Sequence, residues 1–285
     1  MILKDVNDRI KNYLERYFPL NLGFDITDKI KFEVFRILYK EYLIKKYGRD
    51  VIREYDGLSR IVLRKNTDKP YNELNSFVFR TGLINDIMPE VQYRTERTLE
   101  SLLTHLTNIN HPFSVLDLGS GDGRMDIGLA LCLDNLEKLY AVDINKFASY
   151  RMKENIRLLS LGEQEIVNKK IIPVRKDFTK NAFIEWFVNT ERNGINVVLT
   201  AYARYHPLPF MELSAMLLKD KGAVIVCYPY NLVDGADDSK LKDSVDRIIK
   251  YGDEQGSKFG LKFELVDYFR YAPNKFSLIE IGVKI

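Results

Sequence analysis

The chain has 285 residues, 46% of them hydrophobic, which is enough to bury a globular core of one large domain or two smaller ones. The formal net charge of +3 is small for this length, so it neither requires nor excludes a nucleic-acid partner. No run approaches 18 apolar residues and charged residues follow Met1 closely, which predicts neither a membrane span nor a signal peptide and favours a cytoplasmic protein.

Residues 1–110 are expected to form an N-terminal helical extension that takes part in substrate recognition. Helices are predicted over 5–18 and 27–47, the first ended by a proline and the second by a glycine. Lysine and arginine number 15 in residues 1–66, against 10 aspartates and glutamates. This basic excess suits an RNA or an acidic protein partner, and a solvated helix face of mixed charge is the alternative interpretation.

A further helix is predicted over 89–108, because Pro89 suits its first position and leucines recur on one side. It leads into an apolar strand at 115–118, which ends in a segment with glycine at every second position, 119–123. The apolar residues that follow suit a buried helix, so strand, loop and helix predict the opening half of a βαβ unit. Such a loop lets its backbone approach a ligand that lies across the strand ends and the helix N-terminus.

The residues around the glycines do not match a dinucleotide site. A dinucleotide fingerprint places a third Gly or Ala three residues after the second glycine. That position holds Arg124 if the count starts at Gly119 and Asp126 if it starts at Gly121. The loop therefore does not predict binding of NAD.

An acidic residue followed by three alternate glycines, here Asp117 with Gly119, Gly121 and Gly123, resembles motif I of the class I S-adenosylmethionine (SAM) dependent methyltransferases. The resemblance implies SAM as the cofactor and a Rossmann-like methyltransferase domain over 111–285. Its α/β fold is a doubly wound, mostly parallel seven-stranded sheet with an antiparallel last strand.

Two later strands are predicted to end in acidic residues that complete the cofactor site. Asp143 follows the strand at 139–142, about twenty residues beyond the loop, where a carboxylate can accept both ribose hydroxyls. After the strand at 171–174, the resemblance implies that Asp177 takes the adenine amino group and that Phe178 packs beside the adenine ring. The alternative is that Asp177 only caps a following helix.

The resemblance also places Tyr93, in the first turn of the 89–108 helix, near the methionine end of SAM. The residues expected to bind the cofactor come from that turn, the glycine loop and the ends of the neighbouring strands. They are Tyr93, Asp117, Gly119, Ser120, Gly121, Gly123, Asp143, Ile144, Asp177, Phe178 and Thr200.

The acceptor is expected at the carboxyl ends of the strands at 195–199 and 223–227, because ligands bind at that edge of an open parallel sheet. Residues 200–209 follow the first of these strands and provide two candidate catalytic residues, Tyr202 and His206, the second as a proton acceptor. A surface position in a proline-containing turn is the alternative for His206. The residues predicted to line an aromatic acceptor pocket beside Tyr202 are Tyr205, Tyr228 and Tyr230.

The chain ends in a predicted hairpin, 262–271 with 276–285, and a reversed last strand is typical of the methyltransferase fold. Cys132 and Cys227 fall in apolar helix and strand patterns and are interpreted as core thiols in a reducing compartment. Three scattered histidines give no metal-site spacing, so no metal is expected.

The expected activity is methyl transfer from SAM to an undetermined acceptor. Residues 117–124 repeat the loop of a subset of seven-strand lysine methyltransferases, which also have a tyrosine and a threonine near 93 and 95, and this resemblance favours a protein lysine. RNA and small-molecule acceptors stay open, and a SAM-binding protein without catalysis is the less favoured alternative.

Overall fold

The computed structural model describes residues 8, 9, 12, 13, 16, 37–46, 52, 53, 62, 63, 89–201, 207–231, 238–272 and 275–285. The described residues among 8–16 and those of 37–46 are helical. The further elements, in chain order, are β1 (Ile52–Arg53), β2 (Val62–Leu63), α5 (Pro89–Leu106), β3 (Phe113–Leu118), α6 (Arg124–Cys132), β4 (Leu136–Val142), α7 (Lys146–Arg157), α8 (Leu161–Lys170), β5 (Ile171–Val174), α9 (Asn181–Thr190), β6 (Ile195–Ala201), α10 (Pro207–Leu217), β7 (Leu218–Asn231), α11 (Asp238–Gly256), η3 (Ser257–Phe259), β8 (Leu261–Ala272) and β9 (Lys275–Lys284).

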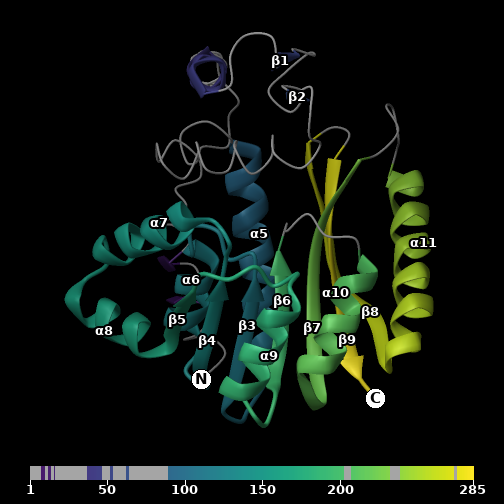
Figure 1. Ribbon diagram of the computed structural model, residues 1–285. Helices are drawn as coiled ribbons and strands as arrows, with labels where there is room; N and C mark the ends of the chain where they lie inside the picture. Colours follow the sequence, from purple (N-terminus) through teal and green to yellow (C-terminus); the bar gives the residue numbers. More distant parts are fainter. Residues whose placement is uncertain are drawn as a thin grey trace.

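A seven-stranded sheet with the order β5-β4-β3-β6-β7-β9-β8 forms the centre of the molecule (Figure 1). Strands β3 to β7 pair in parallel, whereas β9 is antiparallel to both β7 and β8. The prediction of a doubly wound, mostly parallel seven-stranded sheet with a reversed last strand is confirmed, and this is the class I methyltransferase fold. The chain moves outward from β3 to β5 and then returns to β6, so the ligand-binding switch point lies at the carboxyl ends of β3 and β6.

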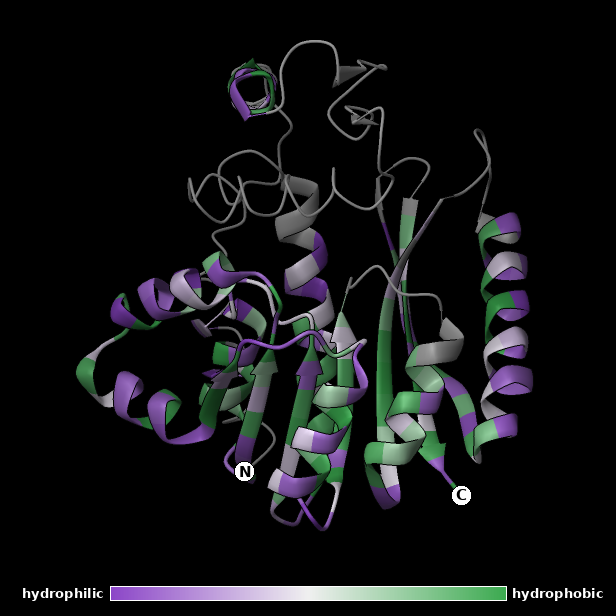
Figure 2. Ribbon diagram, viewed as in Figure 1, coloured by the Kyte–Doolittle hydropathy of each residue, from purple (hydrophilic) through white to green (hydrophobic). Residues whose placement is uncertain are grey.

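Alternate residues of the strands face two different helical layers. Val115 packs in a cluster with residues of α5 and α6, and the next residue, Leu116, packs in a cluster with residues of α9 and α10. Both side chains are fully buried. In the outer layer, α11 is hydrophilic on one side and hydrophobic on the other (Figure 2). The burial of both sheet faces explains why its strands read as nearly continuous apolar runs.

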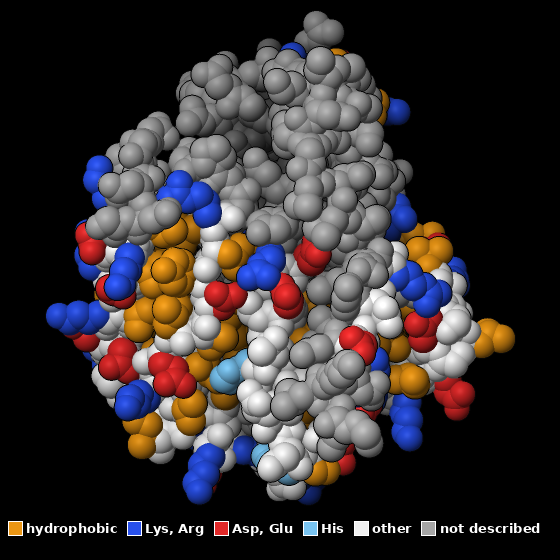
Figure 3. Space-filling view, turned by 180° about the vertical axis from the view of Figure 1, so that it is seen from behind, with side chains coloured by type: hydrophobic (Ala, Val, Ile, Leu, Met, Phe, Trp, Pro, Cys, Tyr) orange, Lys and Arg blue, Asp and Glu red, His pale blue; other side chains and the backbone are white. Residues whose placement is uncertain are grey.

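The face seen from behind carries basic and acidic side chains interspersed with one another and with apolar patches (Figure 3). Within the basic N-terminal stretch, only the helix over residues 37–46 is described over enough length to show which basic side chains are exposed. Lys45 and Lys46 are exposed there. Lys40 in the same helix is partly buried, and outside this helix the basic residues of 1–66 have described side chains only at Arg9 and Arg16. Both of these arginines bind carboxylates, Arg9 that of Asp134 at 2.8 Å and Arg16 that of Glu163 at 3.0 Å.

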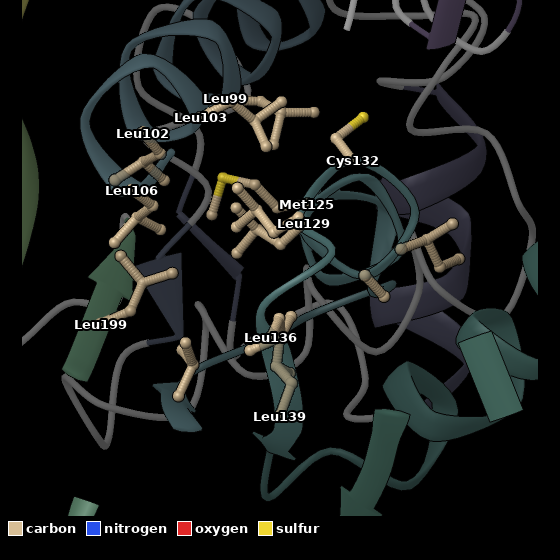
Figure 4. Packing of buried hydrophobic residues seen from close by; sticks show 14 of the residues in the cluster. Leu99, Leu102, Leu103, Leu106, Met125, Leu129, Cys132, Leu136, Leu139 and Leu199 are labelled. Carbon is tan, nitrogen blue, oxygen red and sulfur yellow. The ribbon is translucent and has the colours of Figure 1, made fainter. Parts of the chain in front are cut away.

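Helix α5 was predicted from its recurring leucines, and Leu99, Leu102, Leu103 and Leu106 are at most 1% exposed. Figure 4 shows them pointing toward Met125 and Leu129 of α6 and Leu199 of β6. The helix that precedes the glycine loop in sequence therefore also packs on the helix that follows it. Cys132, in the same cluster, and Cys227, in β7, are free buried thiols, in agreement with the core interpretation.

Strand β7 is longer than the sequence pattern indicated. The pattern placed its end at Cys227, but it continues to Asn231, because β9 pairs with it residue by residue as far as the Asn231 to Lys275 partners. Tyr228 and Tyr230 therefore lie within the strand. Between β4 and β5 the chain also forms α7 and α8, which the periodicity did not predict. No helix in the described ranges is long and apolar enough to cross a membrane.

Replacing Gly128 with alanine is expected to lower the free energy of unfolding by about 1–3 kcal/mol. Alanine ordinarily stabilises a helix relative to glycine by about 0.5–1 kcal/mol. At Gly128, however, a Cβ atom would lie 2.6 Å from Leu99 Cδ2 and 2.7 Å from Tyr13 Cε1, so the packing of α6 would have to shift. Gly162 in α8 is the matched control, because a Cβ there meets no atom within 4 Å. Guanidinium denaturation should show a loss for G128A and no loss for G162A, and equal stability of the two variants would contradict this packing.

Candidate cofactor-binding site

The glycine loop between β3 and α6 adopts the backbone that the sequence pattern requires. Gly119, Gly121 and Gly123 have φ angles of 95°, 58° and 74°, a region that residues with a Cβ atom rarely adopt. The N–H groups of Gly119 and Ser120 donate to the carbonyl oxygen of Val142 at 2.8 and 3.1 Å. The start of the loop is thereby fixed to the carboxyl end of β4.

Helix α7 packs directly against the end of the loop. A Cβ atom on Gly123 would lie 2.6 Å from Met152 Cγ, and the φ angle of 74° is one that L side chains rarely adopt, so glycine is strongly favoured here. Asn155 Nδ2 donates to the carbonyl oxygen of Asp122 at 3.0 Å. The N-terminal segment adds a third contact, because the Tyr13 hydroxyl donates to the carbonyl oxygen of Arg124 at 2.7 Å. Elements on both sides of the loop therefore hold its backbone in one conformation.

Asp143 lies across from the middle glycine of the loop. Its Oδ2 accepts from the Gly121 N–H at 3.0 Å and its Oδ1 from the Asn145 N–H at 2.7 Å. Burial raises the pKa of Asp143, and these two backbone hydrogen bonds oppose the rise. The sequence prediction placed this acid next to the loop, and the structure brings the two together.

A pair of buried carboxyl groups lies beneath the loop. Asp117, at the end of β3, is 1% exposed and Asp126, in the first turn of α6, is fully buried. The two carboxyl groups lie close enough for each to affect the pKa of the other. Asp117 Oδ1 and both carboxyl oxygens of Asp126 have no hydrogen-bond partner among the described residues. Burial raises the pKa of Asp117 to about 7 and that of Asp126 well above the usual range, and the charge of Asp117 raises the pKa of Asp126 further.

A third carboxylate completes an acidic environment around the loop. Asp122 Oδ2 accepts from Arg124 Nε at 2.9 Å, and the negative charge of Asp122 also raises the pKa of Asp126. A helix N-terminus after a glycine loop is ordinarily a site for phosphate. Here Asp117 at the end of β3 and Asp122 just before α6 lie next to that position, so a diphosphate would meet like charge, whereas a cationic ligand would be attracted.

The candidate adenine-binding residues lie at the end of β5. Asp177 Oδ1 accepts from both the N–H and the hydroxyl of Thr179, at 3.0 and 2.6 Å. The capping alternative is wrong, because α9 begins at Asn181 with Lys180 at its N-cap position and no side chain caps it. Phe178 is half-buried and packs against the cluster of α9 and α10. Both residues lie at the same edge of the sheet as the loop.

Thr200 and Ile144 occupy very different surroundings. The Thr200 hydroxyl donates to the Leu118 carbonyl oxygen at 3.0 Å and the residue is 1% exposed, so this side chain ties β6 to β3. Ile144 follows Asp143 and is 54% exposed.

The remaining predicted residues are divided between β7 and segments outside the description. Tyr228 and Tyr230 lie on one side of β7, with ring centroids 6.2 Å apart. Tyr93 belongs to the first turn of α5, and its side chain is outside the described part of the chain. Tyr202, Tyr205 and His206 lie outside the described residues.

Sequence reasoning missed three buried residues, Asp126, Met152 and Glu280. Asp126 was considered only as a failed glycine position, although an acid in an apolar helix start is itself a signal of a buried polar contact. Met152 showed no signal, because its contact with the loop comes from packing. Glu280 interrupts the apolar β9, and that interruption was visible in the sequence. In the parts of the chain that are described, no group of three or more His, Cys, Asp or Glu side chains is arranged to hold a metal ion.

No model of a known protein family matches the chain, and no curated protein matches it. Solved structures are similar in fold. Magnesium protoporphyrin IX methyltransferase from Synechocystis PCC 6803, with bound SAH, has 13% identity and a TM-score of 0.49, over 74% of this chain and 98% of that one. Precorrin-6y C5,15-methyltransferase from Geobacter metallireducens GS-15 has 13% identity and a TM-score of 0.43, over 68% and 89%.

A third solved structure, M. jannaschii TYW2 in complex with AdoMet, has 19% identity and a TM-score of 0.41, over 63% of this chain and 72% of that one. Identity is at most 19% and the TM-score stays below 0.5 in these three structures. These likenesses concern the fold alone.

Proposed function

We propose that this chain is a SAM-dependent methyltransferase. The observation that carries the proposal is the acidic surrounding of the glycine loop, where buried Asp117 and half-buried Asp122 lie next to a position that phosphate ordinarily takes. SAM carries a sulfonium and an ammonium group, so it matches this charge, whereas the diphosphate of a dinucleotide does not. The motif I resemblance agrees with this choice of ligand.

The residues present fit this cofactor. The buried Oδ1 of Asp117, which has no hydrogen-bond partner within the described ranges, suits a cationic group. Asp143, fixed beside Gly121, would accept the ribose hydroxyls, and the positive-φ glycines let the loop backbone approach the ligand closely. When bound, SAM supplies an electrophilic methyl group on a positively charged sulfur.

The protein contributes positioning and exclusion of water, which are worth on the order of 7–11 kcal/mol in well-oriented reactions. In this proposal Tyr202 and His206 are the candidates for proton transfer, and Tyr205, Tyr228 and Tyr230 line the acceptor pocket. Asp177 and Phe178 take the adenine end and Tyr93 the methionine end. Residues 1–110 contribute to acceptor recognition.

The acceptor that we propose is a protein lysine, which the loop at 117–124 favours through its resemblance to lysine methyltransferases. A lysine ammonium must lose a proton before it can be methylated, which costs about 4–5 kcal/mol at pH 7. An aromatic, desolvated pocket offsets part of that cost. RNA and small-molecule acceptors are the alternatives, and the interspersed charges on the face seen in Figure 3 offer no specific support for RNA.

Calorimetric titration with SAM and, in parallel, with NAD tests the cofactor assignment. We expect micromolar SAM binding and no NAD binding, because the carboxylates around the loop repel a diphosphate. SAM with a labelled methyl group is then incubated with the protein and a cell extract split into protein, RNA and small-molecule fractions. Label in the protein fraction supports the lysine proposal. SAM binding without label in any fraction indicates a binding protein, and absence of SAM binding refutes the proposed function.

A further inference from the structure

A second buried carboxyl group lies in the sheet, away from the glycine loop. Glu280 is in the middle of β9 and is 3% exposed. Its Oε1 has no hydrogen-bond partner among the described residues, and no described cation affects its ionisation. Burial raises the pKa of Glu280 to about 8. An unpartnered buried carboxyl group costs stability, and such a group in a native protein commonly has a functional reason.

Glu280 adjoins the tyrosines of β7. It is the direct partner of Val226 in the β7–β9 pairing, and Tyr228 is the next residue on the same side of β7. The Tyr228 hydroxyl is buried and has no partner within the described ranges. The Tyr230 ring follows, 6.2 Å from that of Tyr228 and stacked on Phe276 at 5.4 Å. Both tyrosine pKa values are raised, first by burial and then by the charge of Glu280, so both hydroxyls are neutral at physiological pH.

The direction of the strands places these tyrosines at the edge of the sheet where the parallel strands end and where ligands bind. Asp117 is level with Leu199 in β6, and Leu199 is level with Ile225 in β7. Tyr228 and Tyr230 therefore lie beyond the level at which β3 gives way to the glycine loop. The line from Tyr230 through Tyr228 to Glu280 leads from this edge into the interior. Helix α11 covers its inner end, where Gly252 leaves room for the carboxyl group, since a Cβ there would be 2.9 Å from Glu280 Oε1.

We propose that Glu280, Tyr228 and Tyr230 form a binding site for the cationic amine group of the methyl acceptor. An ammonium group supplies the charge partner and the hydrogen-bond donor that the carboxyl group lacks. Tyrosine rings attract cations through their electron-rich faces, and the Tyr228 hydroxyl adds a neutral hydrogen-bond acceptor. The assignment to the acceptor rests on the proposed methyltransferase function, whereas amine binding at Glu280 can be measured without it.

The test compares amines with neutral molecules of the same shape, by NMR titration and thermal shift of the full chain without SAM. One pair is N-acetyl-lysine amide and N-acetyl-norleucine amide, and the other is 1,4-diaminobutane and 1,4-butanediol. We expect only the amines to bind. Binding of the lysine derivative alone indicates a protein acceptor, and binding of diaminobutane alone indicates a small amine. No preference for the amines overturns the proposal.

Glu280→Gln keeps the shape of the side chain and removes its charge. We expect E280Q to bind the amines at least about tenfold more weakly, with SAM affinity within about twofold of the unchanged chain. Glu264→Gln, an exposed carboxyl group on β8, is the matched control and should bind amines normally. If E280Q does not fold, Tyr228→Phe takes its place, with an expected loss of about threefold. Unaltered amine binding in the folded variant overturns the proposal. If the unchanged chain does not bind SAM, the proposed function is refuted, but the amine-binding result remains valid.

Discussion

Replacing Asp143 with alanine is expected to weaken SAM binding by more than about tenfold and by as much as about 100-fold. Each hydrogen bond to a charged acceptor contributes about 1.5–3 kcal/mol, and the ribose would lose its acceptor in the variant. The loop would also lose the bond between the Gly121 N–H and Asp143 Oδ2, which now has a length of 3.0 Å. The expected loss therefore combines a missing ligand contact with a less ordered loop.

Calorimetric titration of D143A with SAM checks this expectation. Asp143→Asn is the informative second variant, because its amide oxygen can still accept one hydrogen bond, and it should fall between the unchanged chain and D143A. Asp220→Ala, at an exposed position of β7, is the control and should bind SAM normally. An affinity of D143A equal to that of the unchanged chain would show that Asp143 does not contact the cofactor.

Replacing Asp126 with asparagine is expected to make the protein more stable at alkaline pH. Burial raises the pKa of Asp117 to about 7 and that of Asp126 higher, so the folded chain holds protons that the unfolded chain releases near pH 4. The stabilising contribution of this pair is complete below pH 4 and is lost as the pH rises through about 7 and beyond. An asparagine amide cannot ionise, and its NH2 group can donate a hydrogen bond to Asp117. The pKa of Asp117 should then fall toward its ordinary range.

The measurement is urea denaturation at pH 5, 7 and 9. We expect the free energy of unfolding to decrease with pH in the unchanged chain, and D126N to exceed it by about 1–3 kcal/mol at pH 9. At pH 5, where Asp126 is protonated, the two should be similar. Asp246→Asn, an exposed carboxylate on α11, should follow the unchanged chain at all three values. The same pH dependence in D126N and the unchanged chain would show that the buried pair does not carry this proton.

Much of the fold could be predicted from local patterns. The glycine loop, the strands around it and the final hairpin each carry a signal within a few residues, either a special backbone requirement or an apolar run. Asp143 was predicted beside the loop because a βαβ unit brings the ends of neighbouring parallel strands together. Helix α5 was evident from its leucines. The boundary of β7 was wrong, because its last residues are strand only through pairing with β9, about fifty residues later in the chain.

The sequence alone determined the class of fold, the loop conformation and the acids at the strand ends, since these depend on residue type and short spacing. Only the tertiary structure showed that Asp126 pairs with Asp117, that Met152 closes on Gly123 and that Glu280 lies unpartnered beside Tyr228. Two of these contacts join residues that are distant in sequence. The third depends on the direction in which the Asp126 side chain of α6 points relative to the Asp117 side chain of β3. Their chemistry depends on burial, which raises the pKa of a carboxyl group only when the surrounding layers exclude water. No local pattern records that exclusion, because it is a property of the packed sheet and helices together.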